Sequence, residues 1–502
     1  MLRRLLLFSS VFVVLNASAQ VHPFEKKFAL IDRYFDSLLK EWNIPGLALG
    51  IVYKDQLIYS KGYGYRNIEK QLRVESTTLF PIASNTKLFT ATAACMLAEE
   101  KKLSLDKPIK NYLPALNFNT EELTAKVTLR DMLSHRTGLP RYDGLWVNAS
   151  YSRKEIIEKI SYMKPLLGFR EGYIYNNMMF ATAGVVMEQV TGLSWEDIIR
   201  QKLFRPLQMT ASCFSTADMK TYGNYSLSYF EADSTRKLLP KQYEAQSEAL
   251  GPAGTIKSSI EEMSHWMIAQ LNGGKYKGVQ VIPVAAISQT LIPNNIADKE
   301  SRWPELSNGL YCMGRTIQTY KGYKITSHTG SIDGFYSNLT LVPDQQLAIF
   351  VVHNAVEAGS LRSVMSLPVI DRLLDLSYTP WSQRYLMGQV WDRAQDKKIR
   401  DSLQALQVKN TTPSHPLSAY TGTYVHAVYG DVKIELQNNQ LVFVFRSQRS
   451  LLHHFHYDQF ITDESKTDLP DFRLSFLTNS KGDINTIRMM PFGDPVTEFV
   501  KK

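Results

Sequence analysis

The sequence has few cysteines, and they are not arranged for cross-linking. Cys95, Cys213 and Cys312 are far apart, odd in number and form no C-x-x-C pair. Such spacing argues against a disulfide framework or a cysteine-based zinc site. We therefore expect buried free thiols, which behave as small hydrophobic groups.

Motifs for metal-dependent and nucleophile-elbow chemistry are also missing. The chain contains neither H-E-x-x-H nor G-x-S-x-G, which excludes the common zinc-peptidase pattern and argues against an α/β-hydrolase. His453, His454 and His456 lie close together, but no carboxylate or cysteine cluster completes a ligand set. We expect these histidines to pack within a strand rather than to bind metal.

Long runs of one charge and long apolar runs are absent from most of the chain. The formal net charge is +9, yet acidic residues are interspersed with the basic ones, so no nucleic-acid partner is expected. No segment after the N-terminus is apolar enough for a transmembrane helix. The mildly basic surface is compatible with anionic substrates or envelope polymers.

The N-terminus has the three parts of a secretory signal. Arg3 and Arg4 make the first four residues a basic region, residues 5–15 are mainly apolar but too short to span a bilayer, and Ala17-Ser18-Ala19 matches an A-x-A cleavage site. We expect residues 1–19 to be removed and the protein to be secreted into a periplasm. An uncleaved anchor is the alternative, and no cysteine follows the apolar run to carry a lipid.

The hydrophobic pattern predicts an α/β (α+β) domain over residues 24–378. Residues 25–42 have helical periodicity, and two short strands follow around a turn at Lys54-Asp55. The middle of the chain is helical, and strands return from about 308 to 354. Strands at both ends of the segment indicate one sheet completed by the two ends.

A second, all-β domain is predicted over residues 413–502. A charged helical linker is expected at 379–412, ending in the turn-rich NTTPSHP stretch. Beyond it, short segments alternate apolar and polar residues around turns, as strands with one buried face do.

A serine three residues before a lysine occurs five times in the chain, so the spacing alone selects none of the pairs. On a helix the two side chains share a face, and the lysine can act as the base for the serine. Ser84-x-x-Lys87 follows Pro81 and precedes an apolar helical run, which places Ser84 at a helix start, where developing negative charge is favoured. The four other serines lie within a helix, in loops or beside prolines: Ser37, Ser104, Ser161 and Ser234.

The pattern Y-x-N, which occurs four times, would supply two groups that the site needs. Its tyrosine can relay a proton, and its asparagine provides an amide for the substrate. Tyr175-Asn176-Asn177 precedes a helix of small and apolar residues and so lies at a loop-to-helix junction, which can face a cleft. A tyrosine can relay a proton if neighbouring cations keep its phenol acidic. The other three lie at a strand end, in a turn and inside a strand: Tyr65, Tyr222 and Tyr336.

A basic residue followed by Thr-Gly is the third element. Arg136-Thr137-Gly138 follows a short helix and is typical of a helix stop. His328-Thr329-Gly330 lies at the end of an expected strand, where the glycine would allow a substrate backbone to approach. The backbone N–H groups of Ser331 and Ser84 are then candidates for an oxyanion hole.

Taken in order, Ser84-x-x-Lys87, Tyr175-x-Asn177 and His328-Thr329-Gly330 resemble the serine β-lactamase and penicillin-binding protein superfamily, in its class C-like branch. The flanks LRDMLSHRTGLPRYD and GPAGTIKSSIEEMSHWM are similar too. The resemblance covers about residues 25–375. It implies an antiparallel sheet flanked by helices with an all-helical subregion, and a barrel-like C-terminal module.

The resemblance implies a serine hydrolase that acts on amide or ester bonds through an acyl-enzyme, without metal or cofactor. Lys87, together with Tyr175, would deprotonate Ser84, while Asn177, His328 and Thr329 orient a small-molecule, peptide or peptidoglycan-derived substrate. D-alanyl-D-alanine carboxypeptidase, β-lactamase, esterase and D-amino-acid peptidase activities all remain open. A penicillin-binding sensor without turnover is the alternative of another class, and the oligomeric state is not predicted.

Two departures from the superfamily pattern are visible. His328 stands where lysine is commoner, which removes a permanent charge at neutral pH and weakens the case for a dedicated β-lactamase. Arg170-Glu171-Gly172 stands in place of the usual Pro-Gly turn ahead of Tyr175.

Overall fold

The structure is a computed structural model. The predicted signal segment 1–19 lies outside the residues it describes. Among the helices of the described chain, none has both the length and the apolarity needed to cross a bilayer. The described residues are 24–146, 149, 151–232, 235–241, 248–463 and 472–502.

Helices and strands alternate irregularly along the chain. The α-helices are α1 (Glu25–Glu41), α2 (Thr86–Glu99), α3 (Glu121–Lys126), α4 (Leu129–Leu133), α5 (Arg153–Glu158), α6 (Asn177–Thr191), α7 (Trp195–Ile199), α8 (Thr216–Tyr222), α9 (Gly251–Gly254), α10 (Ile260–Leu271), α11 (Val284–Gln289), α12 (Leu367–Leu373), α13 (Trp381–Ala405) and α14 (Leu417–Tyr420). The strands before α13 are β1 (Gly46–Tyr53), β2 (Gln56–Asn67), β3 (Leu72–Arg73), β4 (Phe80–Pro81), β5 (Ser228–Glu231), β6 (Leu238–Lys241), β7 (Lys257–Ser258), β8 (Lys275–Tyr276), β9 (Val279–Gln280), β10 (Asn295–Ile296), β11 (Leu310–Tyr311), β12 (Thr316–Tyr320), β13 (Tyr323–Ile332), β14 (Phe335–Val342) and β15 (Leu347–His353).

The main sheet has nine strands in the order β10-β11-β12-β13-β14-β15-β1-β2-β3, and each neighbouring pair is antiparallel. Strand β1 pairs with β15, with Leu47 opposite His353, so segments about 300 residues apart close the centre of the sheet. This confirms the prediction that both ends of the segment complete one sheet. The expected hairpin around Lys54-Asp55 is formed by β1 and β2.

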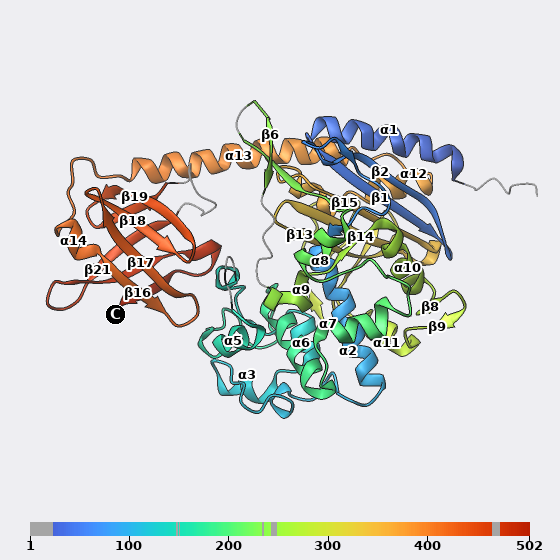
Figure 1. Cartoon of the computed structure of the whole chain (residues 1–502), viewed down its shortest axis with the longest axis horizontal. Coiled ribbons are helices and arrows are strands. Elements are labelled where there is room, and N and C mark those ends of the chain that lie inside the picture. The colour runs from blue at the N-terminus through green and yellow to red at the C-terminus, as the bar shows by residue number, and fades with distance from the viewer. Residues whose placement is uncertain (1–23, 147–148, 150, 233–234, 242–247, 464–471) are drawn as a thin grey trace, which may run out of the picture.

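Both faces of the sheet are covered, and β1 shows why. Its alternate side chains enter two separate hydrophobic cores, one beneath α1 and α12 and the other beneath α2 and α10 (Figure 1). Period-2 alternation sends successive residues to opposite faces, and here both faces are apolar. The first core receives Leu47, Leu49 and Ile51, and the second receives Ala48 and Val52.

Helix α2 is the centre of the all-helical side of the domain. All of its residues from Thr86 to Leu97 are buried, and it contacts α6, α7, α9 and α11. Because α2 begins at Thr86, directly after the turn that contains Ser84, this packing immobilises the segment that carries the candidate nucleophile.

The C-terminal part is a closed eight-stranded barrel joined to the sheet domain by α13, which runs along one side of the molecule (Figure 1). These observations confirm an antiparallel sheet flanked by helices and a C-terminal β-barrel. The barrel strands are β16 (Gly422–His426), β17 (Gly430–Gln437), β18 (Gln440–Phe445), β19 (Gln448–His456), β20 (Gln459–Thr462), β21 (Arg473–Thr478), β22 (Ile484–Met489) and β23 (Thr497–Lys501).

Candidate active site

Ser84 lies in a tight turn that enters α2. The turn is a 3₁₀ segment, Ala83–Asn85, and α2 begins at Thr86, so the predicted helix-start position is confirmed. Ala83 has φ +49°, a left-handed conformation that is uncommon and strained for a residue with a Cβ. The strained backbone turns the Ser84 side chain toward the cavity described below.

Lys87 is fully buried, and its amine contacts three oxygen atoms. Lys87 Nζ lies 3.0 Å from Ser84 Oγ, 2.8 Å from Asn177 Oδ1 and 2.7 Å from the carbonyl oxygen of Ala253. Burial lowers the pKa of Lys87 well below its ordinary value, and the charge of Arg141 lowers it further. A neutral amine donates to the two oxygens that can only accept and turns its lone pair toward the Ser84 hydroxyl, as a general base requires.

Tyr175 lies on the other side of Ser84. Its hydroxyl donates to Ser84 Oγ at 2.8 Å, and Asn176 places it there by capping α6, with its side-chain oxygen accepting from Met179 N–H. Burial raises the pKa of Tyr175 although Arg141 lies over its ring. The expectation that cations keep this phenol acidic is therefore wrong, because desolvation outweighs their charge.

Asn177 bridges two side chains within the site. Its Oδ1 accepts from Lys87, and its Nδ2 donates to Asp143 Oδ1 at 3.2 Å. Both ends of the amide contact the protein, which fixes the orientation of the amide and the position of the Lys87 amine. Asn177 also lines the cavity described below, and its role in holding the substrate stays a prediction.

His328 is neutral and held at both nitrogens. Nδ1–H donates to the carbonyl oxygen of Thr329 at 2.7 Å, and Nε2 therefore accepts from the Tyr311 hydroxyl at 3.0 Å. Burial lowers the pKa of His328 to about 3, with a further contribution from Lys87. The strand does not end here as expected, since β13 continues to Ile332.

Gly330 is required by the protein itself. A Cβ at this position would lie 2.3 Å from the carbonyl oxygen of Ile82 and 2.3 Å from Ser337 Oγ. Close packing of β13 against the turn that contains Ser84 therefore requires glycine here, and the approach of a substrate backbone stays a prediction. Absence of a side chain at Gly330 lets the strand and the nucleophile turn meet.

A cavity of about 690 Å³ joins these elements. Six residues predicted from the sequence line it: Ser84, Tyr175, Asn177, His328, Thr329 and Ser331. Lys87 and Gly330 lie behind this wall. The structure thus brings the three sequence motifs together around one cavity.

Sequence reasoning missed four residues of the site: His135, Arg141, Asp143 and Tyr311. Arg141 pairs with Asp143, with Nε 2.6 Å from Oδ2, and both line the cavity. His135 is fully buried, packs on the rings of Tyr175 and Tyr311, and accepts from the Asn176 N–H at Nδ1. The LRDMLSHRTGLPRYD flank, which resembles the superfamily, could have indicated three of them, because it contains His135, Arg141 and Asp143.

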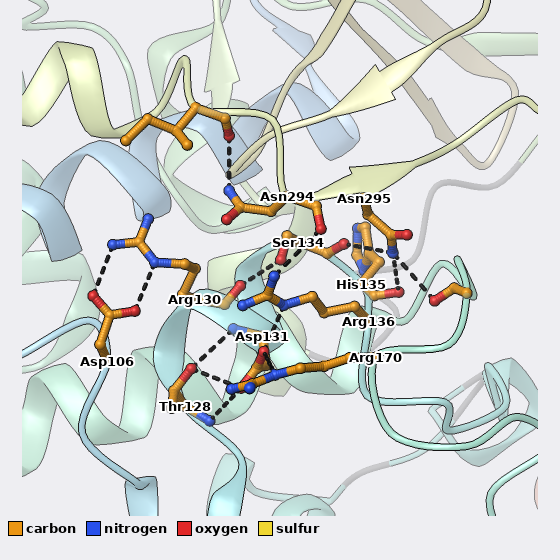
Figure 2. Close-up of polar contacts among 12 residues, drawn as sticks. Asp106, Thr128, Arg130, Asp131, Ser134, His135, Arg136, Arg170, Asn294 and Asn295 are labelled. Carbon is orange, nitrogen blue, oxygen red and sulfur yellow. Dashed lines mark hydrogen bonds and ion pairs between the residues drawn. The ribbon is translucent and has the colours of Figure 1, made fainter.

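A polar network beneath the site holds the two loops that carry these residues (Figure 2). Asp131, fully buried, receives both Nε and Nη2 of Arg170 at 2.8 and 2.9 Å and Nε of Arg136 at 2.5 Å. Burial alone would raise the pKa of Asp131, but bonds from Arg170 and Thr128 and the charge of Arg136 bring it below its usual value. Asn295 completes the network by donating to three backbone carbonyls, those of Ser134, His135 and Gly172.

The network explains the unusual turn ahead of Tyr175. Arg170 has φ +66°, a conformation that glycine adopts at no steric cost. Its backbone N–H donates to the carbonyl oxygen of Arg136 at 2.9 Å, and its side chain binds Asp131. An arginine therefore replaces the Pro-Gly turn because its charge ties this loop to the carboxylate below.

The other candidate serines lie away from this cavity. Ser37 is within α1, Ser104 is in a loop and Ser161 is in a 3₁₀ turn, while Ser234 lies outside the described residues. No described serine other than Ser84 has both a lysine and a tyrosine as hydrogen-bond partners.

The histidine cluster on β19 and the cysteines show no sign of a second functional site in the described residues. His454 on β19 donates from Nε2 to the carbonyl oxygen of Tyr457 at 2.8 Å. In the described ranges, no three His, Cys, Asp or Glu side chains gather as metal ligands. Cys95 and Cys312 are buried free thiols, as predicted, and Cys213 is free but half-buried.

Solved structures share this fold. An octameric penicillin-binding protein homologue from Pyrococcus abyssi superposes with a TM-score of 0.61 at 18% identity, covering 94% of this chain and all of that one. A D-amino acid amidase from Ochrobactrum anthropi SV3 gives 0.58 at 19% identity, covering 70% and 98%. The fold and the ordered motifs are those of the serine β-lactamase and penicillin-binding protein superfamily.

Sequence comparison defines the family. Residues 31–366, more than half of the chain, match the family described as Beta-lactamase, and the chain belongs to that family. Residues 406–500 match a domain of unknown function, DUF3471. Among curated proteins, an unguisins hydrolase from Aspergillus campestris is 26% identical over 449 residues, covering 86% of this chain and 80% of the relative.

The burial of Asp131 predicts that removing its charge destabilises the protein much more than removing the charge of Asp106, which also pairs with an arginine. Asp131→Asn should lower the free energy of unfolding by about 3 kcal/mol, because it removes a fully buried carboxylate charge that pairs with the guanidinium groups of both Arg136 and Arg170. Urea denaturation followed by tryptophan fluorescence measures this difference. Asp106, whose side chain is 64% exposed in its pair with Arg130, is the matched control.

For Asp106→Asn we expect a change below about 1 kcal/mol, as for other exposed pairs. Equal losses in the two variants would contradict the assigned importance of the buried carboxylate.

Proposed function

We propose that this protein is a secreted serine hydrolase that cleaves amide or ester bonds through an acyl-enzyme on Ser84. One observation carries the proposal. The Ser84 hydroxyl lies between the Lys87 amine at 3.0 Å, whose pKa is lowered by burial, and the Tyr175 hydroxyl at 2.8 Å, whose pKa is raised by burial. A base and an acid in contact with one nucleophile are the components that acyl transfer needs.

In the acylation step, Lys87 Nζ takes the Ser84 proton as Oγ attacks the carbonyl carbon. The phenol of Tyr175 gives its proton to the departing nitrogen or oxygen. The Lys87 ammonium then returns a proton toward Tyr175, whose ring centroid lies 4.8 Å from Nζ. This division of roles follows from the two opposite pKa shifts, since burial keeps the lysine neutral and the tyrosine protonated.

The tetrahedral oxyanion would be held by the backbone N–H groups of Ser84 and Ser331. Both residues line the cavity, one at the start of α2 and the other on β13. Water then attacks the acyl-enzyme, with the same lysine and tyrosine moving the proton. The described side chains provide all of these proton transfers.

The charge of the cavity favours a substrate without a carboxylate at its reacting end. Two arginines and three aspartates line the cavity: Arg141, Arg362, Asp143, Asp298 and Asp333. Burial also disfavours the charged forms of His328 and Lys87, so the cavity holds no excess of positive charge to attract a carboxylate. This supports an ester, an amide or a D-amino-acid peptide over a β-lactam or a D-Ala-D-Ala terminus.

Hydrolysis is also supported by the relatives, which include an unguisins hydrolase and, by fold, a D-amino acid amidase. A panel of p-nitrophenyl acetate, a D-amino acid amide, a D-Ala-D-Ala peptide and nitrocefin separates the substrate classes. Turnover of the first two is expected. Stable labelling by a fluorescent penicillin without turnover of any substrate would favour a sensor instead.

Replacing the nucleophile gives the direct test. Ser84→Ala should abolish labelling by a fluorophosphonate probe and lower hydrolysis by about 10³-fold or more, because no other residue can form the acyl-enzyme. Mass spectrometry of the labelled wild-type protein locates the adduct. Ser104→Ala, at another serine with the same lysine spacing, is the control and should label normally; an adduct on a serine other than Ser84 would contradict the proposal.

The depressed pKa of Lys87 predicts the pH profile. The amine is neutral above its pKa, so the rate of Ser84 acylation should fall as pH falls through a value well below the ordinary 10.5. His328, with a pKa of about 3, should add no limb between pH 5 and 8. Stopped-flow acylation by a p-nitrophenyl ester measures this profile. If the fall in rate at low pH disappeared in His328→Gln, the titrating base would be His328, which would contradict the assignment of Lys87.

A further inference from the structure

The C-terminal barrel contacts the loop that carries Arg141 and Asp143 through hydrogen bonds and ring packing. Asp494, 5% exposed and located between β22 and β23, accepts the backbone N–H of Tyr142 at Oδ1 (2.8 Å) and the hydroxyl of Tyr429 at Oδ2 (2.7 Å). The rings of Tyr142 and Tyr429 also pack together, with centroids 5.6 Å apart. A single barrel carboxylate therefore fixes the backbone immediately before Asp143.

The residues after Asp143 are held just as closely. A Cβ on Gly144 would lie 2.2 Å from Cδ2 of Phe492, so the barrel packs directly on this backbone. Arg446 Nη2 donates to the carbonyl oxygen of Leu145 at 2.6 Å. The barrel thus contacts the chain on both sides of Asp143 while leaving that side chain facing the cavity.

Asp143 connects these barrel contacts to the proposed base. Its Oδ1 accepts from Asn177 Nδ2 at 3.2 Å, and Asn177 Oδ1 accepts from Lys87 Nζ at 2.8 Å. The same residues also act on the pKa of Lys87. Burial lowers it most, Arg141 lowers it further, and Asp143 raises it. A small displacement of Asp143 would change both the position and the protonation of the amine.

We propose that the C-terminal barrel is a working part of the active site and that Asp494 is a positioning residue, which holds Asp143 so that Asn177 and Lys87 are aligned on Ser84. This inference rests on the proposed function, because it is Ser84 acylation that the alignment serves. Figure 1 shows the barrel beside the α5 region of the helical subdomain, and Lys159 donates to the barrel carbonyl of Ala427 there at 3.3 Å.

Three variants separate positioning from a general contribution to folding. Asp494→Ala removes the acceptor for Tyr142 N–H. Asp494→Asn keeps it, because Oδ1 still accepts and the amide can donate to the Tyr429 oxygen. Asp431→Ala is the matched control, since it removes a barrel carboxylate whose ion pair with Lys502 is exposed.

The measured quantity is the rate constant of Ser84 modification by a fluorophosphonate, per labelled site in the full-length protein, together with kcat and KM for a p-nitrophenyl ester. We expect Asp494→Ala to lower the rate constant and kcat by about tenfold with little change in KM. Asp494→Asn should recover most of the rate, and Asp431→Ala should equal wild type.

A double-mutant cycle tests the route through Asp143. If Asp494 acts through that side chain, Asp494→Ala adds no further loss to Asp143→Asn; additive losses would overturn the proposed route. Labelling of Asp494→Ala at the wild-type rate would overturn the inference as a whole. Should Asp494→Ala not fold, Arg446→Met replaces it with the same expectation. A wild-type protein that fails to label at Ser84 would instead refute the proposed function.

Discussion

The burial of one lysine amine is the constraint on which the site depends. Removing an ammonium from water is costly, so a lysine with no exposed surface loses its proton more readily than a free one. The cost is moderated by oxygen partners that come from three separate segments: the turn at Ser84, the start of α6 and the end of α9. Lys87 can be neutral and still aligned only while all three segments keep their places, and the surrounding fold is arranged to hold them.

Each segment has its own support. The nucleophile turn is pressed against β13, where Gly330 leaves room for the carbonyl oxygen of Ile82. The loop before α6 is tied through Arg170 to the buried carboxylate of Asp131. The loop at Asp143 is hydrogen-bonded to Asp494 and Arg446 of the barrel. Rigid placement matters because an acid and a base act on one hydroxyl only within hydrogen-bond distance.

Local sequence patterns were enough for the elements and for the central pair. Helical periodicity predicted α1, alternation predicted the β1–β2 hairpin, and the i to i+3 spacing paired Ser84 with Lys87. The contacts that local patterns did not predict are set by long-range packing: Asp143 contacts Asn177, 34 residues further along the chain, and Tyr311 on β11 contacts His328 on β13, two strands away in the sheet. The acidity of Tyr175 was misjudged for the same reason, since burial depends on segments that no local pattern describes.

The titratable groups around Ser84 share one property that bears on what the site can accept. Burial lowers the pKa of Lys87, His135 and His328 and raises the pKa of Tyr175, so it favours the uncharged form of each group. The nearest full charges, on Arg141 and Asp143, neutralise each other as a pair. Arg362 also lines the cavity, but Asp298 and Asp333 line it too, so the lining carries no excess of positive charge to offset the hydration that a substrate carboxylate would lose. An uncharged carbonyl would lose little, and the charge that develops on its oxygen during attack would meet backbone dipoles that are already oriented. This arrangement supports the proposed preference for a neutral acyl group, whose charge appears only in the transition state.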